Sequence, residues 1–140
     1  MTSTSFALDP RLAGDTVWVC DWTLSSVLLM DDRRYPWLVL VPRRPNLVEP
    51  FDLSPGDQER LWREVGHAGA LLKRTTGSAK INIGALGNIV SQLHVHVIAR
   101  TEGDAAWPGP VWGKGSAERF DAVALSREGE RFRTLLQPPV

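Results

Sequence analysis

Gln92-Leu93-His94-Val95-His96-Val97-Ile98, followed by Ala99 and Arg100, is the stretch around which this 140-residue chain is organised. In an extended strand, successive side chains point to opposite faces. Gln92, His94 and His96 therefore fall on one face, and the apolar residues between them fall on the other. A bare His-x-His on the solvent face of a half-buried strand is also an ordinary structural arrangement, so the neighbouring residues decide between the two interpretations.

The segment just before this stretch favours a chemical role for the histidines. Asn82–Asn88 contains two glycines and lies between two apolar segments. Loops of this kind bring backbone N–H groups close to an anion. A neutral imidazole can act as a nucleophile and a second imidazole as a proton donor near pH 7. The two segments together predict a site for a phosphate-sized anion above His94.

The stretch resembles the signature of the histidine triad (HIT) superfamily, His-x-His-x-His followed by two apolar residues. Aligned on the apolar pair and Arg100, His94 matches the middle histidine, the nucleophile that becomes nucleotidylated in the family, and His96 matches the third. Gln92 takes the place of the first histidine and cannot act as an acid. The resemblance covers about residues 6–112 and is to a proteobacterial type of HIT protein with glutamine at this position.

The resemblance also implies substrate contacts outside the motif. An acidic residue after the second strand accepts hydrogen bonds from ribose in the family, which points to Asp31 or Asp32. Asn82 and the Gly87-Asn88 pair match positions that hold the α-phosphate and sugar. From the residues alone, the two aspartates also fit an ordinary turn that caps backbone N–H groups, and Asn82 fits a simple turn residue.

Two departures from the family pattern accompany Gln92. A serine that donates to phosphate in some relatives is Ile89 here, and a histidine that helps to orient the nucleophile is replaced by Trp37. Farther along, Trp107 and Trp112 lie in a loop rich in proline and glycine. They either plug the core or stack on a nucleobase. We expect Arg100 to be a solvated strand end rather than a phosphate ligand.

Composition limits the classes of function. Sixteen basic and sixteen acidic residues cancel, which argues against a nucleic acid polymer or an acidic membrane as partner. The single cysteine, Cys20, is interpreted as a small buried residue, and one cysteine suits a reducing cytoplasm. Met1–Ser5 is polar and is followed by no long apolar run, so neither a signal peptide nor a membrane span is expected. We predict a cytoplasmic protein.

The pattern of hydrophobic residues predicts one α+β domain spanning residues 1–140, with a core at about 6–112 and a C-terminal helical extension at about 113–140. An antiparallel sheet of about five strands carries a long helix on one face. The predicted strands cover residues 15–22, 27–30, 37–41, 80–83 and 93–99. Residues 6–12 are predicted to form a turn or a short helix, and the other predicted helices cover residues 55–75, 116–125 and 127–136. His67 lies off the apolar stripe of the long helix and is assigned no chemistry.

These observations predict a nucleotide-binding hydrolase or transferase. His94 would attack the α-phosphate of a dinucleoside polyphosphate or nucleoside phosphoramidate, and His96 would hydrogen-bond the phosphoryl oxygens or leaving group. No metal or other cofactor is required, and the family implies a homodimer. Because two family histidines are replaced, a nucleotide-binding module with little turnover is the alternative. An interaction protein that uses the Trp107–Trp112 loop is a third possibility.

Overall fold

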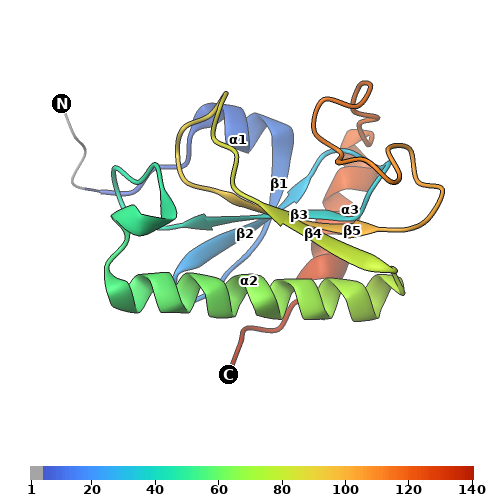
Figure 1. Ribbon diagram of the computed structural model, residues 1–140. Helices are drawn as coiled ribbons and strands as arrows, with labels where there is room; N and C mark the ends of the chain where they lie inside the picture. Colours follow the sequence, from blue (N-terminus) through green and yellow to red (C-terminus); the bar gives the residue numbers. More distant parts are fainter. Residues whose placement is uncertain (1–4) are drawn as a thin grey trace.

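The computed structural model describes residues 5–140, which form a five-stranded antiparallel sheet with helices (Figure 1). The sheet has the strand order β1-β2-β3-β5-β4. The strands are β1 (Thr16–Asp21), β2 (Ser25–Met30), β3 (Trp37–Pro42), β4 (Lys80–Gly84) and β5 (Val95–Arg100). The helices are α1 (Pro10–Asp15), the short 3₁₀ helix η1 (Pro50–Asp52), α2 (Pro55–Thr76) and α3 (Ala122–Leu135). The predicted α+β class, with a long helix on one face, is confirmed.

Each face of the sheet carries its own hydrophobic core. On one face, α2 and α3 pack against the strands, with Leu72 and Phe132 in the same cluster as Val95 and Val97 (Figure 1). On the other face, α1 and the connections after β4 and β5 cover a second cluster that includes Trp37. Strand β5 is consequently buried along its whole length. The alternative interpretation, in which the two histidines lie on a solvent face, does not hold, because these connections lie over them.

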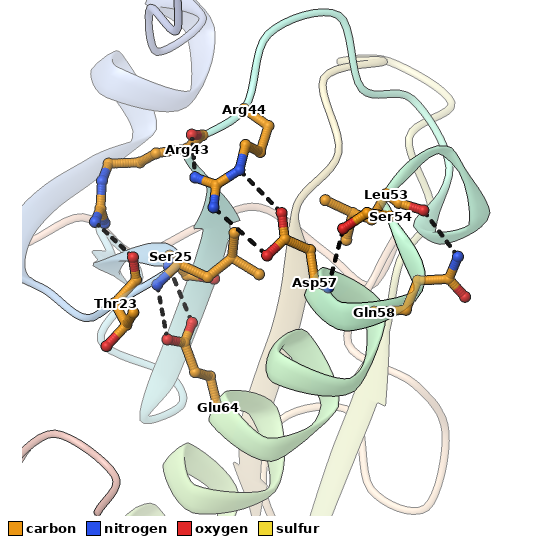
Figure 2. Close-up of polar contacts among 10 residues, drawn as sticks. Thr23, Ser25, Arg43, Arg44, Leu53, Ser54, Asp57, Gln58 and Glu64 are labelled. Atoms are coloured by element: carbon orange, nitrogen blue, oxygen red, sulfur yellow. Dashed lines mark hydrogen bonds and ion pairs between the residues drawn. The ribbon is translucent and has the colours of Figure 1, made fainter.

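Local contacts fix α2 at its start and in its middle (Figure 2). Ser54 caps the helix by accepting a hydrogen bond from the Asp57 N–H group, and the next residue is a proline. Glu64 is almost fully buried, and its carboxylate accepts the N–H groups of Leu24 at 2.9 Å and Ser25 at 3.0 Å. Helix α2 is thereby joined to the β1–β2 turn, on the face away from the histidines.

The structure changes the predicted elements at both ends of the chain. Within the predicted turn or short helix at residues 6–12, the helix itself begins only at Pro10, with Asp9 as its cap. The two predicted C-terminal helices, residues 116–125 and 127–136, are one helix, α3, capped by Asp121. The segment before Asp121 is instead tied to the β2–β3 turn by hydrogen bonds, which are described below. This tie competes with helix formation there.

Cys20 and His67, which the sequence analysis does not place in the site, both pack within the fold. Cys20 is half-buried on β1, and burial raises the pKa of its thiol to about 11. His67 is half-buried, with its ring edge against Trp22 and its Nε2 atom 2.7 Å from the carbonyl oxygen of Gln137. Both residues lie on the side of the sheet covered by α2 and α3.

None of the helices within residues 5–140 has the length and apolar character needed to cross a membrane.

Candidate active site

A cavity of about 480 Å³ lies on the face of the sheet opposite α2. Its walls are the turn after β2, the connection between β4 and β5, the two histidines and the segment after Val111. Pockets for small organic ligands have volumes of roughly 300–1,000 Å³. The predicted site residues that line the cavity are Asp31, Asp32, Gly87, Asn88, His94, His96 and Trp112. The cavity is therefore large enough for a nucleotide-sized molecule.

His94 is oriented by the backbone of its own segment. Its Nδ1 atom lies 2.6 Å from the carbonyl oxygen of Gln92. A carbonyl oxygen only accepts hydrogen bonds, so Nδ1 carries a proton, and in the neutral form of the ring Nε2 keeps a lone pair. The segment is itself anchored, because the N–H group of Leu93 donates to the carbonyl oxygen of Leu47 at 3.0 Å. In its neutral form, His94 thus has the tautomer suited to nucleophilic attack through Nε2.

His96 has the opposite tautomer. The indole N–H group of Trp37 donates to Nδ1 of His96 at 3.0 Å, so the ring proton of His96 resides on Nε2. The rings of Trp37 and Trp112 meet His96 edge-on, with centroids 5.6 and 5.4 Å away. Burial, followed by the charge of nearby His94, lowers the pKa of His96 to about 3. His96 is therefore a neutral hydrogen-bond donor rather than an acid that titrates near pH 7, and Trp37 orients it.

Asp31 and Asp32 hold one wall of the cavity in place. Asp31 accepts the Nε–H group of Arg119 at 2.9 Å and the N–H group of Phe120 at 2.8 Å. Asp32 accepts the Nη2–H group of Arg34 at 2.8 Å. Burial opposes ionisation of Asp32, but hydrogen bonds from Arg34 and from the backbone of residue 118 outweigh it, so its pKa lies below the usual range. Each carboxylate retains lone pairs for a further donor such as a hydroxyl group.

The glycine-containing connection forms the facing wall. Gly87 has φ of +67°, a left-handed conformation that glycine adopts without steric cost. Asn88 follows it, and Leu86, Ile89 and Val90 add apolar surface to the cavity. The predicted positions Gly87 and Asn88 are thus brought to the cavity.

The structure does not bring three predicted residues to this cavity. Gln92 directs its amide to the N-terminal segment, where Oε1 accepts the N–H group of Asp9 and Nε2 donates to the carbonyl oxygen of Ala7, both at 2.8 Å. Asn82 accepts a hydrogen bond from Arg100 through its side-chain oxygen, also at 2.8 Å. Trp107 lies beneath the guanidinium group of the same arginine, 5.8 Å from the ring centroid. Each of the three side chains is held by a structural partner.

Arg100 is the centre of a buried polar cluster and not the solvated strand end that we expected. It is 1% exposed, and its Nε and Nη2 atoms donate to Asp104 at 2.8 and 2.9 Å. Asp104 also accepts the backbone N–H groups of Thr101, Ala106 and Trp107. Hydrogen bonds from Arg100 lower the pKa of Asp104 to about 2. The pair fixes the start of the connection that carries Trp112 to His96.

Sequence reasoning missed several residues of the cavity wall. Three basic residues line it: Arg34, Lys114 and Arg119. Apolar residues from distant segments complete it: Leu12, Met30, Val90 and Val111. Arg34 follows Asp32 by two positions, a spacing that signals a local ion pair. Arg119 lies 88 residues from its partner Asp31, and no local pattern connects them.

Because Gly84 has no side chain, the ring of Trp112 has room to pack beside His96. A Cβ atom on residue 84 would lie 2.9 Å from Cη2 of Trp112, closer than real Cβ contacts. Gly84→Ala is therefore expected to displace the indole and to lower the free energy of unfolding by about 1–3 kcal/mol, measured by urea denaturation. Gly66→Ala is the matched control, since it lies exposed in α2 with free space around it and should stabilise by about 0.5–1 kcal/mol. Equal stabilities of the two variants would contradict this packing argument.

Comparisons with known proteins show what the chain and its fold are similar to. Residues 13–103 match the family described as HIT domain. A histidine triad protein from Sinorhizobium meliloti 1021 is 51% identical, with a TM-score of 0.88 over 95% of this chain and 96% of that chain. A histidine triad protein from Bradyrhizobium japonicum is 45% identical, with a TM-score of 0.89 over 95% and 99% of the two chains. One from Marinobacter aquaeolei VT8 is 39% identical, with a TM-score of 0.90 over 94% and 96%. No curated protein sequence matches this chain closely enough to add to these structures.

Proposed function

Because the chain belongs to the histidine triad (HIT) family, we propose that it binds a nucleotide and acts as a hydrolase or transferase at the α-phosphate. The observation that carries the proposal is the 2.6 Å contact between Nδ1 of His94 and the carbonyl oxygen of Gln92. In the neutral ring this contact leaves Nε2 unprotonated, and the ring lines a cavity of nucleotide size. The substrate is a nucleoside phosphate derivative of the dinucleoside polyphosphate or phosphoramidate type.

The roles of the side chains follow from their surroundings. Nε2 of His94 attacks the α-phosphorus and forms a nucleotidyl-histidine, which water or another acceptor then cleaves. The developing positive charge on the ring is stabilised by the carbonyl oxygen that Nδ1–H contacts. His96 donates a hydrogen bond from Nε2 to a phosphoryl oxygen, and its other nitrogen is held by Trp37.

The remaining walls suit a nucleoside. Asp31 and Asp32 keep acceptor capacity for ribose hydroxyl groups. The flat ring of Trp112, together with the apolar residues of the wall, offers a surface for a base. The Gly87-Asn88 segment borders the phosphate end, close to the histidines that line the same cavity.

Trapping the covalent intermediate tests this proposal. Wild-type protein is mixed with a dinucleoside polyphosphate or with AMP-morpholidate and is analysed by intact-protein mass spectrometry. We expect an added mass of one nucleoside monophosphate in the wild type and none in His94→Ala. If nucleotide raises the melting temperature but no adduct or product forms, the chain is a binding module. If nucleotide neither binds nor reacts, the proposal is wrong and an interaction role through the Trp107–Trp112 loop gains support.

We also propose that the protein is a homodimer. Strand β4 is an edge of the sheet, and it exposes Ile83 next to the exposed Leu86 and Ile89. Unpaired strand edges with apolar side chains are surfaces that a second chain can cover. Light scattering at several protein concentrations measures the mass, and a monomer throughout would contradict the proposal.

A further inference from the structure

The contact with Trp37 determines where His96 carries its proton. Nδ1 accepts the indole N–H group at 3.0 Å, which requires a lone pair on Nδ1. An imidazolium ion has hydrogens on both nitrogens, so a charged His96 would set two N–H groups against each other in a buried place. Trp112 lies against the same ring and is uncharged, and the titratable group beside it is His94, 4.9 Å away between ring centroids. The fold therefore keeps His96 neutral.

Most other side chains able to donate a proton at the site are held in hydrogen bonds or ion pairs. The Gln92 side chain is an amide and is bonded to the N-terminal segment. The aspartates that line the cavity pair with arginine side chains: Asp15, Asp31 and Asp32. Lys114 is the remaining titratable acid among the described residues of the wall. Its backbone carbonyl oxygen accepts a hydrogen bond from Arg34 at 2.7 Å, so its backbone lies at the Asp32 end of the cavity.

From this arrangement we propose that the site expels only leaving groups that are stable as anions. It would thus prefer phosphoanhydrides, the dinucleoside polyphosphate class, to nucleoside phosphoramidates. The inference rests on the proposed function and narrows its substrate class. The inference depends on the hydrogen bond from the indole N–H group of Trp37 to Nδ1 of His96, because this bond blocks protonation of His96.

The two reactions differ in their need for a proton. With a phosphoanhydride, Nε2 of His94 bonds to the α-phosphorus while the P–O bond breaks, and the electron pair leaves with a phosphate group that is stable as an anion near neutral pH. Water then forms a new P–O bond, the P–Nε2 bond breaks, and a nucleoside monophosphate and a proton are released. With a phosphoramidate, the electron pair of the broken P–N bond goes to nitrogen, which must take a proton from an acid as it leaves.

Two substrates with the same nucleoside test the preference. kcat/KM is measured at pH 7 for diadenosine tetraphosphate and for adenosine 5′-phosphoramidate. General acids contribute about 10²-fold to 10⁴-fold, so we expect the tetraphosphate to be at least about 10²-fold faster. A series of AMP esters with phenols of graded acidity should show a rate that falls steeply as the phenol becomes less acidic. Equal rates for the two adenosine substrates, or rates independent of phenol acidity, would overturn the inference.

Two variants test whether Trp37 causes the preference for phosphoanhydrides. Trp37→Phe keeps a ring but removes the N–H group, which frees Nδ1 of His96 to take a proton. We expect the ratio of tetraphosphate to phosphoramidate activity to fall at least about tenfold in this variant. An unchanged ratio contradicts the role of Trp37. Lys114→Gln should leave the ratio as in the wild type, whereas a selective loss of phosphoramidate activity would identify the lysine as the acid and overturn the inference.

A measurement without substrate separates this inference from the proposed function. The ¹⁵N chemical shifts of the His96 ring report which nitrogen carries a proton. We expect a neutral ring with the proton on Nε2 from pH 5 to 8 in the wild type, and in Trp37→Phe an upward shift of the His96 pKa with part of the proton on Nδ1. Titration of His96 in the wild type would refute the inference even if the adduct forms. Failure of every substrate to give an adduct would instead refute the proposed function.

Discussion

His94→Gly is expected to lower kcat/KM for a dinucleoside polyphosphate by at least about 10³-fold, because it removes the attacking atom of the proposed reaction. The loss should appear in kcat, since the cavity walls proposed to hold the nucleoside are unchanged. Nucleotide affinity, measured by isothermal titration calorimetry, should stay within about threefold of the wild-type value. The fold should also persist, because the hydrogen bond of the His94 ring goes to the backbone of its own segment, at Gln92, and joins no distant elements.

Rescue by a small molecule makes this prediction specific. Imidazole added to His94→Gly should restore part of the turnover, because it supplies the missing ring in the space that glycine leaves. His67→Gly is the matched control, since this histidine lies on the other side of the sheet against Trp22. It should keep wild-type kcat. Turnover by His94→Gly without imidazole at more than a tenth of the wild-type rate would exclude His94 as the nucleophile.

Asp104→Ala is expected to lower the free energy of unfolding by about 3–5 kcal/mol, because it leaves the buried Arg100 guanidinium without its carboxylate partner. The same change removes the acceptor for three backbone N–H groups of the connection that follows β5. Urea denaturation measures the loss. Asp57→Ala is the control, since its ion pair with Arg44 is more exposed and should contribute at most about 1 kcal/mol (Figure 2). Similar losses in the two variants would contradict the importance of burial.

The effect of Asp104 should depend on pH in a defined direction. Its folded pKa of about 2 lies below the ordinary value of 3.8, so the folded state binds a proton less readily than the unfolded state. The contribution of its charge to stability is therefore complete above pH 4 and is lost as the pH falls toward 2. The difference in unfolding free energy between wild type and Asp104→Ala should shrink over this range. A constant difference would show that charge pairing is not the cause.

Regular elements of this chain could be predicted because their signals are local. The long helix has a serine cap, a proline at its first position and Gly77 with positive φ at its end, and the observed bounds differ from the predicted ones by one residue. The central strands follow runs of β-branched and leucine residues. Predictions failed where a distant contact overrides the local pattern. Residues 116–120 have a helical composition, yet Asp31 and Asp32 accept hydrogen bonds from their backbone, and the segment is not helical.

Much of the candidate site could be predicted, because the motif and the resemblance single out the histidines, the aspartate turn and the glycine-containing connection. What could not be predicted is the partner of each polar side chain. Trp37 and His96 are 59 residues apart, and only the pairing of β3 with β5 brings the indole to the imidazole. Likewise, the partners of Gln92 and Asn82 come from segments far away in the sequence. Trp37 and Gln92, which stand where the family pattern has histidines, therefore each supply a different contact: Trp37 to His96 and Gln92 to Asp9.

The double hydrogen bond of Gln92 constrains how this lineage can change. One amide joins residues 7 and 9 to the start of the histidine segment, with a donor and an acceptor on the same planar group. An imidazole ring spaces its two nitrogens differently and cannot reproduce both bonds. An ancestral or future chain with histidine at position 92 would need a different path for residues 7–9. The first motif position and the N-terminal segment must therefore evolve together.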